Sequence, residues 1–131
     1  MAREPPRARP RGIGGADANA AYALPVIFEV SDLPGNLIGR FEGCAHSSSV
    51  SFFIGTFRAG TGPGLHLHPY DETFIVEAGT ATFTIGEETV ELSAGQIAVV
   101  PAGTPHKFVS GQGFRLISIT PADHMTQEDL E

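Results

Sequence analysis

The chain is poor in several residue types, and each shortage excludes a class of protein. Cys44 is the only cysteine among 131 residues, so a zinc site built on two or four thiolates within this chain is excluded. We expect this cysteine to be a small buried apolar residue. No apolar run is long enough to span a membrane. The chain therefore reads as a globular domain that depends neither on cysteine chemistry nor on a membrane.

Basic residues are also scarce. Eight Lys and Arg stand against fifteen Asp and Glu, which gives a net charge of −7 with neutral histidines. Four of the eight lie within residues 1–23, so residues 24–131 carry four basic and thirteen acidic side chains. Because a surface of that sign repels phosphate backbones, we expect no nucleic-acid partner.

Residues 1–23 differ in composition from the rest of the chain. They combine four arginines with several prolines and an Ala/Gly-rich run that lacks hydrophobic periodicity, a pattern typical of disorder. We expect a disordered basic arm here, and one folded domain with a short C-terminal tail at 24–131. The arm resembles a secretion signal only in its positive charge, because no apolar core follows. We therefore expect a cytoplasmic protein.

Short runs rich in β-branched and aromatic residues recur beyond the arm, separated by glycine-containing breaks. Such runs favour strands, which we expect at 25–30, 50–58, 73–77, 80–85, 89–92, 97–100, 106–109 and 114–119. No helical period appears before Thr126, where a threonine cap predicts a short helical turn. Many short strands at this spacing predict an all-β sandwich or barrel.

The first chemical signal is the segment Gly60-x5-His66-x-His68-x3-Glu72-x6-Gly79. If His66 and His68 lie on a strand, their side chains share one face and their bases are roughly 6.5–7 Å apart. Two imidazoles at that separation can close on one ion. A proline directly after His68 ends the ladder, and Glu72 then opens the next strand.

The second signal is the segment Gly95-x5-Pro101-x-Gly103-x2-His106. Its prolines and glycine form a stiff turn that places His106 on the strand leaving it. Together the two segments resemble the paired motifs of the cupin family, over about residues 24–125. The resemblance implies a double-stranded β-helix, the jelly-roll barrel of cupins.

The resemblance also implies one metal site, with His66, His68, Glu72 and His106 around a single divalent ion. Three imidazoles and a carboxylate suit Mn, Fe, Co, Ni, Cu or Zn and argue against Mg and Ca, which prefer oxygen ligands. Four protein ligands on an ion that prefers six leave two positions open, an arrangement typical of catalytic sites. One position departs from the pattern: Ser110 stands where the second motif usually ends in Asn, which predicts altered hydrogen bonding around the ligands.

Two classes of function stay open from the sequence. The first is a metal-dependent enzyme, a dioxygenase-like oxidoreductase or an isomerase or lyase, acting on a small and partly hydrophobic molecule. The second is a module that binds or senses a small molecule without turnover. Phenylalanines 74, 108 and 114 are expected near the pocket.

The sequence offers three weak candidates for catalysis or substrate binding. Tyr70 and Asp71 precede Glu72 in a turn near the expected rim, although surface turn residues without chemistry are commoner. Arg58 ends an expected strand, where a solvated strand end is the favoured interpretation and binding of a substrate carboxylate is the alternative. Resemblance to cupins also implies a homodimer, in which the apolar run at 26–30 lies across the neighbouring subunit.

Overall fold

The computed structural model describes residues 24–35, 37–123 and 126–131. The chain divides into two compact units, Met1–Leu33 and Pro34–Glu131. In the first, residues 24–29 form no strand and a 3-10 turn, η2, follows at Val30–Asp32. The expected strand at 25–30 is therefore wrong, because β propensity without a partner strand does not make a strand. The predicted arm, 1–23, lies outside the described residues, and the predicted domain start at residue 24 stays a prediction.

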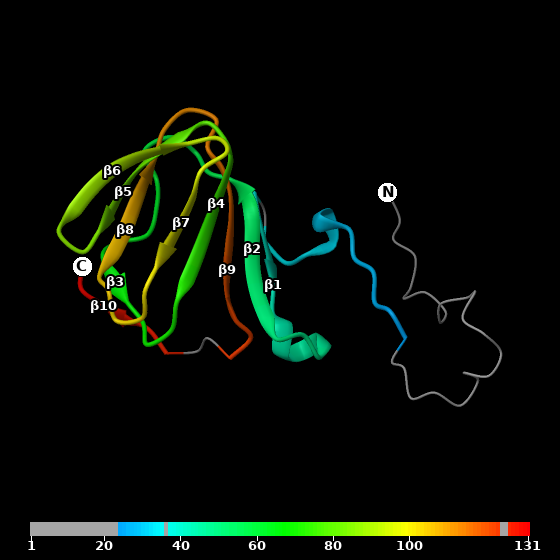
Figure 1. Cartoon of the computed structure of the whole chain (residues 1–131). Helices are drawn as coiled ribbons and strands as arrows, with labels where there is room; N and C mark the ends of the chain where they lie inside the picture. The colour runs from blue at the N-terminus through cyan, green and yellow to red at the C-terminus, as the bar shows by residue number, and fades with distance from the viewer. Residues whose placement is uncertain (1–23, 36, 124–125) are drawn as a thin grey trace. The chain divides into compact units, whose positions relative to one another are not determined.

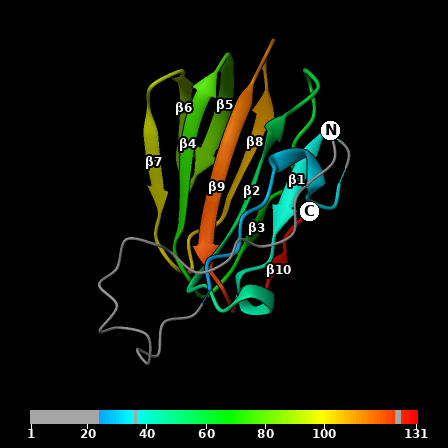
Figure 2. The same ribbon diagram turned by 90° about the vertical axis from the view of Figure 1, so that its right-hand side faces the viewer.

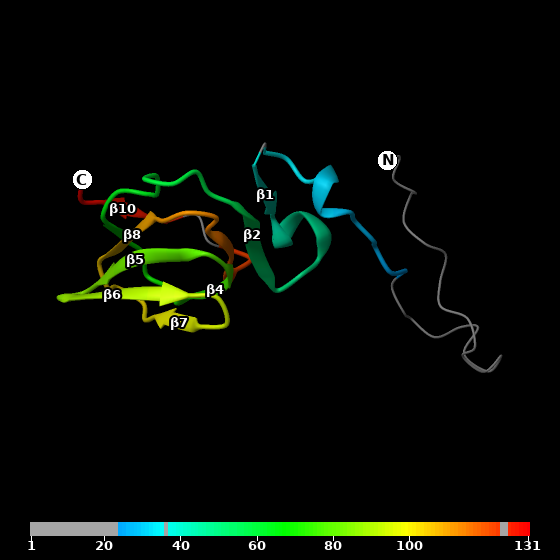
Figure 3. The same cartoon turned by 90° about the horizontal axis from the view of Figure 1, so that it is seen from above.

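The second unit is built from two five-stranded antiparallel sheets, which confirms the all-β prediction (Figure 1). In the first sheet, shown in Figure 2, the order is β1 (Ile38–Phe41), β2 (Val50–Thr56), β9 (Arg115–Pro121), β4 (Glu72–Ala78) and β7 (Ile97–Val100). In the second sheet the order is β10 (Glu128–Asp129), β3 (His66–Leu67), β8 (His106–Ser110), β5 (Thr80–Ile85) and β6 (Glu88–Ser93). From above, β10, β8, β5 and β6 follow one another on one side, and β1 and β2 lie on the other (Figure 3).

The C-terminal segment forms a strand instead of the expected helical turn at Thr126. Glu128 pairs with Leu67 and Asp129 with His66, and the Leu130 amide donates to the Leu65 carbonyl at 2.8 Å. Pairing with a neighbouring strand thus overrides a local helix-start signal. A second 3-10 turn, η3, occupies Gly43–His46, and none of the described helical segments is long and apolar enough to cross a membrane.

Alternation along the strands directs one set of side chains into the space between the sheets. The buried core consists of Phe74, Val76, Ala81, Phe83, Leu92, Val100, Phe108, Phe114 and Leu116. Each fully buried aromatic or aliphatic side chain contributes about 1.5–3 kcal/mol to folding. On β2, Phe53 packs against this core, whereas Phe52 stacks on Phe41 at 4.8 Å. Cys44 is exposed and not buried as expected, because it lies in the short turn η3 outside the sheets.

The outward face of the first sheet carries a row of four isoleucines at matching register. Ile54 on β2 pairs with Ile117 on β9, Ile117 pairs with Ile75 on β4, and Ile75 pairs with Ile97 on β7. Ile97 is 64% exposed, and Val99, two residues along the same strand, is 58% exposed. This isoleucine row is an unusually apolar surface for strands that face outward.

Candidate metal centre

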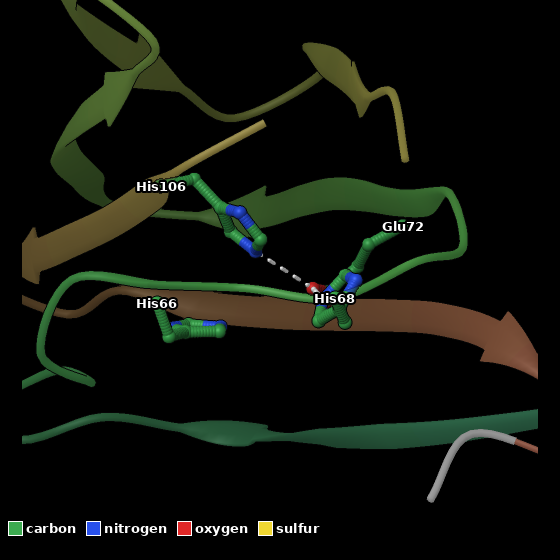
Figure 4. A group of neighbouring side chains, drawn as sticks. All are labelled: His66, His68, Glu72 and His106. Atoms are coloured by element: carbon green, nitrogen blue, oxygen red, sulfur yellow. Dashed lines mark hydrogen bonds and ion pairs between the residues drawn. The ribbon is translucent and has the colours of Figure 1, made fainter. Parts of the chain in front are cut away.

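The four motif side chains come together between the two sheets. His66 and His106 are directly opposite each other on β3 and β8, His68 follows β3, and Glu72 begins β4 in the other sheet. All four are buried, and one potential ligand atom from each lies within 4.8 Å of the others. Figure 4 shows the His68 and His106 imidazoles converging on the Glu72 carboxylate, with His66 beside them. The cluster could therefore hold one metal ion.

Backbone carbonyls fix which nitrogen of each imidazole carries the proton. Nδ1 of His66, His68 and His106 lies 2.7, 2.9 and 2.8 Å from the carbonyl oxygens of Gly64, Tyr70 and Thr104, respectively. A carbonyl oxygen only accepts, so each Nδ1 is the donor. In the neutral ring the lone pair then belongs to Nε2, the nitrogen that a metal would bind.

These lone pairs create an electrostatic conflict that a cation resolves. Nε2 of His68 and Nε2 of His106 lie 3.0 and 3.1 Å from Glu72 Oε1. If both imidazoles are neutral and the carboxylate is ionised, the Nε2 lone pairs face the carboxylate oxygen, and two acceptors repel each other strongly in a buried site. A bound proton or a metal cation removes the repulsion. The donor set thus fits a divalent transition metal, without requiring any rearrangement of the ring tautomers.

Glu72 is held from behind by a residue that the motifs do not contain. The Ser118 hydroxyl, on β9, donates to Glu72 Oε2, which leaves Oε1 directed at the histidines. Burial alone would raise the pKa of Glu72, but hydrogen bonds with His106, Ser118 and His68, and the charge of a protonated His106, together hold the pKa below its ordinary value. The carboxylate is therefore ionised at neutral pH and available as a ligand through one oxygen.

Two backbone amides of the second motif donate hydrogen bonds to the first motif. The Gly103 amide donates to the His68 carbonyl at 2.8 Å, and the Ala102 amide donates to Asp71 Oδ1 at 2.9 Å. Asp71 is exposed and does not line the cavity beside the cluster. Its position supports a role in the turn geometry that locates His106, and a catalytic role for Asp71 stays a prediction.

Tyr70 lies closer to the cluster. Its ring stacks on His68 with centroids 4.1 Å apart and an interplanar angle of 5°. Burial, and then the charge of Glu72, raise the pKa of the Tyr70 hydroxyl. Tyr70 consequently keeps its proton at neutral pH, where it can donate a hydrogen bond but cannot act as a base.

A cavity of about 290 Å³ adjoins the cluster. Its lining comprises Arg40, Phe52, Phe53, Pro63, His66, His68, Tyr70, Glu72, Phe74, Phe108, Thr120 and Gln127. Of the three expected pocket aromatics, Phe74 and Phe108 line it, and Phe114 is in the core. An outer cavity of about 650 Å³ is lined by Gly35, Leu37, Ile38, Arg40, Glu42, Phe53, Phe57, Arg58, Pro63, Phe108 and Gln127. Arg58 thus lies beside the outer cavity, and Arg40, which sequence reasoning missed, lies beside both.

Ser110, which replaces the Asn of the usual motif, forms its hydrogen bonds away from the cluster. Its hydroxyl oxygen lies 2.9 Å from the Arg58 carbonyl oxygen and 2.5 Å from the Thr61 carbonyl oxygen, and these two acceptors share its one proton. The Ser110 carbonyl also accepts from the Gly60 amide at 2.8 Å. Ser110 therefore closes the loop at the start of the first motif, and its hydroxyl does not orient a cluster residue.

The family model for the cupin domain matches residues 53–120, a stretch that contains both motifs and all four cluster residues. The chain belongs to the cupin family. The two sheets described above are accordingly the double-stranded β-helix, or jelly roll, of cupins.

Similar proteins include one relative found by sequence and two enzymes of similar fold. An uncharacterized protein of Streptomyces coelicolor is 42% identical over 70 residues, which are 53% of this chain and 67% of that protein. Oxalate decarboxylase of Bacillus subtilis, a structure described with Mn(II) centres, matches with a TM-score of 0.68 and 18% identity over 79% of this chain and 32% of its own. The DMSP lyase DddQ of Ruegeria pomeroyi matches with a TM-score of 0.55 and 25% identity over 63% of this chain and 43% of its own. The chain therefore spans less than half the length of either enzyme.

Proposed function

We propose that the protein binds one divalent transition-metal ion, drawn from Mn, Fe, Co, Ni, Cu and Zn, through His66, His68, Glu72 and His106. With it, the protein acts as an enzyme on a small, partly apolar molecule. The observation that carries this proposal is the fixed orientation of the three imidazoles: each Nδ1 is held by a backbone carbonyl, and one ligand atom from each ring lies within 4.8 Å of the others and of an ionised carboxylate. A metal site requires ligands held in this way, whereas histidines with a purely structural role do not require a common orientation.

The neighbouring cavity supports the enzymatic part of the proposal. A bound metal of this group polarises a substrate oxygen, and with Fe or Mn also supports dioxygen chemistry. Phe53, Phe74 and Phe108 give the cavity apolar walls that orient a flat or aliphatic molecule and exclude water. Tyr70 donates a hydrogen bond at the rim. Dioxygenase, lyase and isomerase reactions are the classes that this arrangement supports.

The test compares turnover by metal-loaded wild type, His106→Ala and the control His46→Ala, whose imidazole is exposed and stacks on Phe41. Each protein is loaded separately with the six metals. Oxygen consumption is followed over catechols, flavonols and 1,3-diketones, and products of lyase and isomerase reactions by mass spectrometry. We expect at least one metal form to turn over, with activity kept in His46→Ala and lost in His106→Ala. Equal rates in wild type and His106→Ala would contradict the proposal.

A second candidate, a non-catalytic binding or sensing module, is favoured by one observation. Outside the cluster, Tyr70 is the single side chain suited to proton transfer among the described residues lining the inner cavity, and its raised pKa makes it a poor acid. Saturable ligand binding by the metal-loaded protein, with no product from any substrate of the panel, would select this candidate.

The homodimer and the cytoplasmic location stay predictions. The isoleucine row supports the dimer, because Ile97 and Val99 expose apolar surface that a second copy would cover. Light scattering should give twice the chain mass for wild type and a shift toward one chain mass for Ile97→Glu. A monomeric wild type would refute the dimer.

A further inference from the structure

Two arginines that line the cavities have no carboxylate partner among residues 24–35, 37–123 and 126–131. Residues 24–131 hold only four Lys and Arg side chains, and two of them, Lys107 and Arg115, form exposed ion pairs with glutamates at 3.0 Å. Arg40 and Arg58 form no ion pair with any residue that the structure describes, yet both line the outer cavity. In so acidic a domain, unpaired cations gathered at one cavity mark it as a place for an anion.

Strand register directs Arg40 toward the metal cluster. On the inner face of the first sheet, Arg40 pairs with Phe53, Phe53 with Ser118, and Ser118 with Phe74. Ser118 is the residue that holds Glu72. Because neighbouring strands are about 4.8 Å apart, the backbones of Arg40 and Ser118 are separated by roughly 10 Å, a gap that one small molecule can span.

The two cavities adjoin and share their walls. Arg40, Phe53, Pro63, Phe108 and Gln127 line both. The outer cavity adds Phe57 and Arg58, and it also contains one carboxylate, Glu42. Arg40 thus lies in the wall that the outer cavity shares with the inner cavity beside the cluster.

We propose that Arg40 binds the carboxylate of the ligand, with Arg58 as a second positive charge at the outer mouth. The inference rests on the proposed function, because the same ligand places its donor atom at the metal cluster. A planar guanidinium offers two parallel N–H donors that match a carboxylate. The phenylalanines beside it, Phe53, Phe57 and Phe108, take the apolar part. The ligand class is therefore a small carboxylic acid with an aromatic or aliphatic body.

The experiment uses a matched pair of probes, 3-(4-fluorophenyl)propanoate and its uncharged amide, followed by fluorine NMR. Binding is measured with metal-free and zinc-loaded protein, in wild type, Arg40→Gln, Arg40→Lys and the control Arg115→Gln, which removes an equal charge at a surface ion pair. We expect the acid to bind wild type about tenfold more tightly than the amide, since hydrogen bonds to charged groups are of that strength. The preference should vanish in Arg40→Gln, shrink in Arg40→Lys and persist in Arg115→Gln.

Several results would overturn the inference. These are equal affinity of wild type for both probes, no binding of either at millimolar concentration, or the same loss of preference in Arg115→Gln as in Arg40→Gln. Melting curves of each variant show that it is folded before it is compared. Zinc content, measured on the same samples, separates the two proposals. Protein that takes up no zinc but keeps the Arg40-dependent preference counts against zinc at the cluster and leaves the carboxylate site standing. Zinc-loaded protein without that preference refutes the carboxylate site alone.

Discussion

Replacing Ser118 by alanine tests how the cluster carboxylate is held. The Ser118 side chain is only 1% exposed, and its hydroxyl donates to Glu72 Oε2. Alanine leaves that oxygen buried without a donor, and a hydrogen bond to a charged group contributes about 1.5–3 kcal/mol. If this energy serves to fix Glu72 for the ion, metal affinity falls roughly 10- to 100-fold. The unfolding free energy of the metal-free protein falls by about 1–3 kcal/mol as well.

The assay titrates metal against a fluorescent chelator and measures urea unfolding of the metal-free protein. Ser51→Ala is the matched control, because Ser51 is 2% exposed on a neighbouring strand of the same sheet. Its hydroxyl accepts from the Gly43 amide and donates to the Ala122 carbonyl, so its loss should lower stability by about 1 kcal/mol and leave metal affinity unchanged. Unchanged metal affinity in Ser118→Ala, or an equal loss in both variants, would refute the reasoning.

Three further predictions concern the turns and the charge of the cluster. Gly79→Ala should lower the free energy of unfolding by at least about 2 kcal/mol, because the backbone has φ +69° and a Cβ would meet backbone atoms at 2.5 Å. Gly95→Ala, at φ +91° with open space around it, should lower it by only about 1 kcal/mol. Equal losses for the two variants in urea denaturation would contradict this. Metal affinity should fall as pH falls, with protons released on binding, because the ion and protons compete for the same nitrogen lone pairs. The binding enthalpy should therefore differ between two buffers of different ionisation enthalpy, and equal binding enthalpies by calorimetry would contradict the prediction. Glu72, whose pKa is held below the ordinary 4.5, stabilises the metal-free fold above pH 4.5 and loses that contribution as pH falls below it. In Glu72→Gln, the free energy of unfolding should therefore fall less steeply between neutral and acid pH than in wild type. An equally steep fall in both proteins would contradict this assignment.

The cluster was predictable because each motif has a distinct local pattern and the resemblance to cupins implied that the two motifs meet. Alternation along a strand places His66 and His68 on one face, and the prolines and glycine before His106 predict the stiff turn there. Seven of the eight expected strands also followed from local composition, with β5 (Thr80–Ile85) and β7 (Ile97–Val100) matching the expected bounds.

Residues that act across strands were not predictable in this way. Ser118 and Arg40 owe their positions to the pairing of β9 with β4 and of β1 with β2, which joins segments far apart in the sequence. Ser118 occupies an inward position two residues after the buried Leu116, and this polar residue in a core position was the one available signal. β10 likewise exists only because the chain end returns to β3, so a local cap at Thr126 misled the prediction. Register, and not propensity, decided these cases.

The most direct test of the central claim is the number of metal ions bound per chain. Wild type, His106→Ala and His46→Ala are stripped with EDTA, dialysed separately against each of the six metals, and analysed by mass spectrometry for metal and protein. The proposed site predicts about one ion per chain for wild type and for His46→Ala, and a strong reduction for His106→Ala. Wild type that retains none of the metals, or His106→Ala loaded as fully as wild type, would contradict the claim that these four side chains form a metal centre.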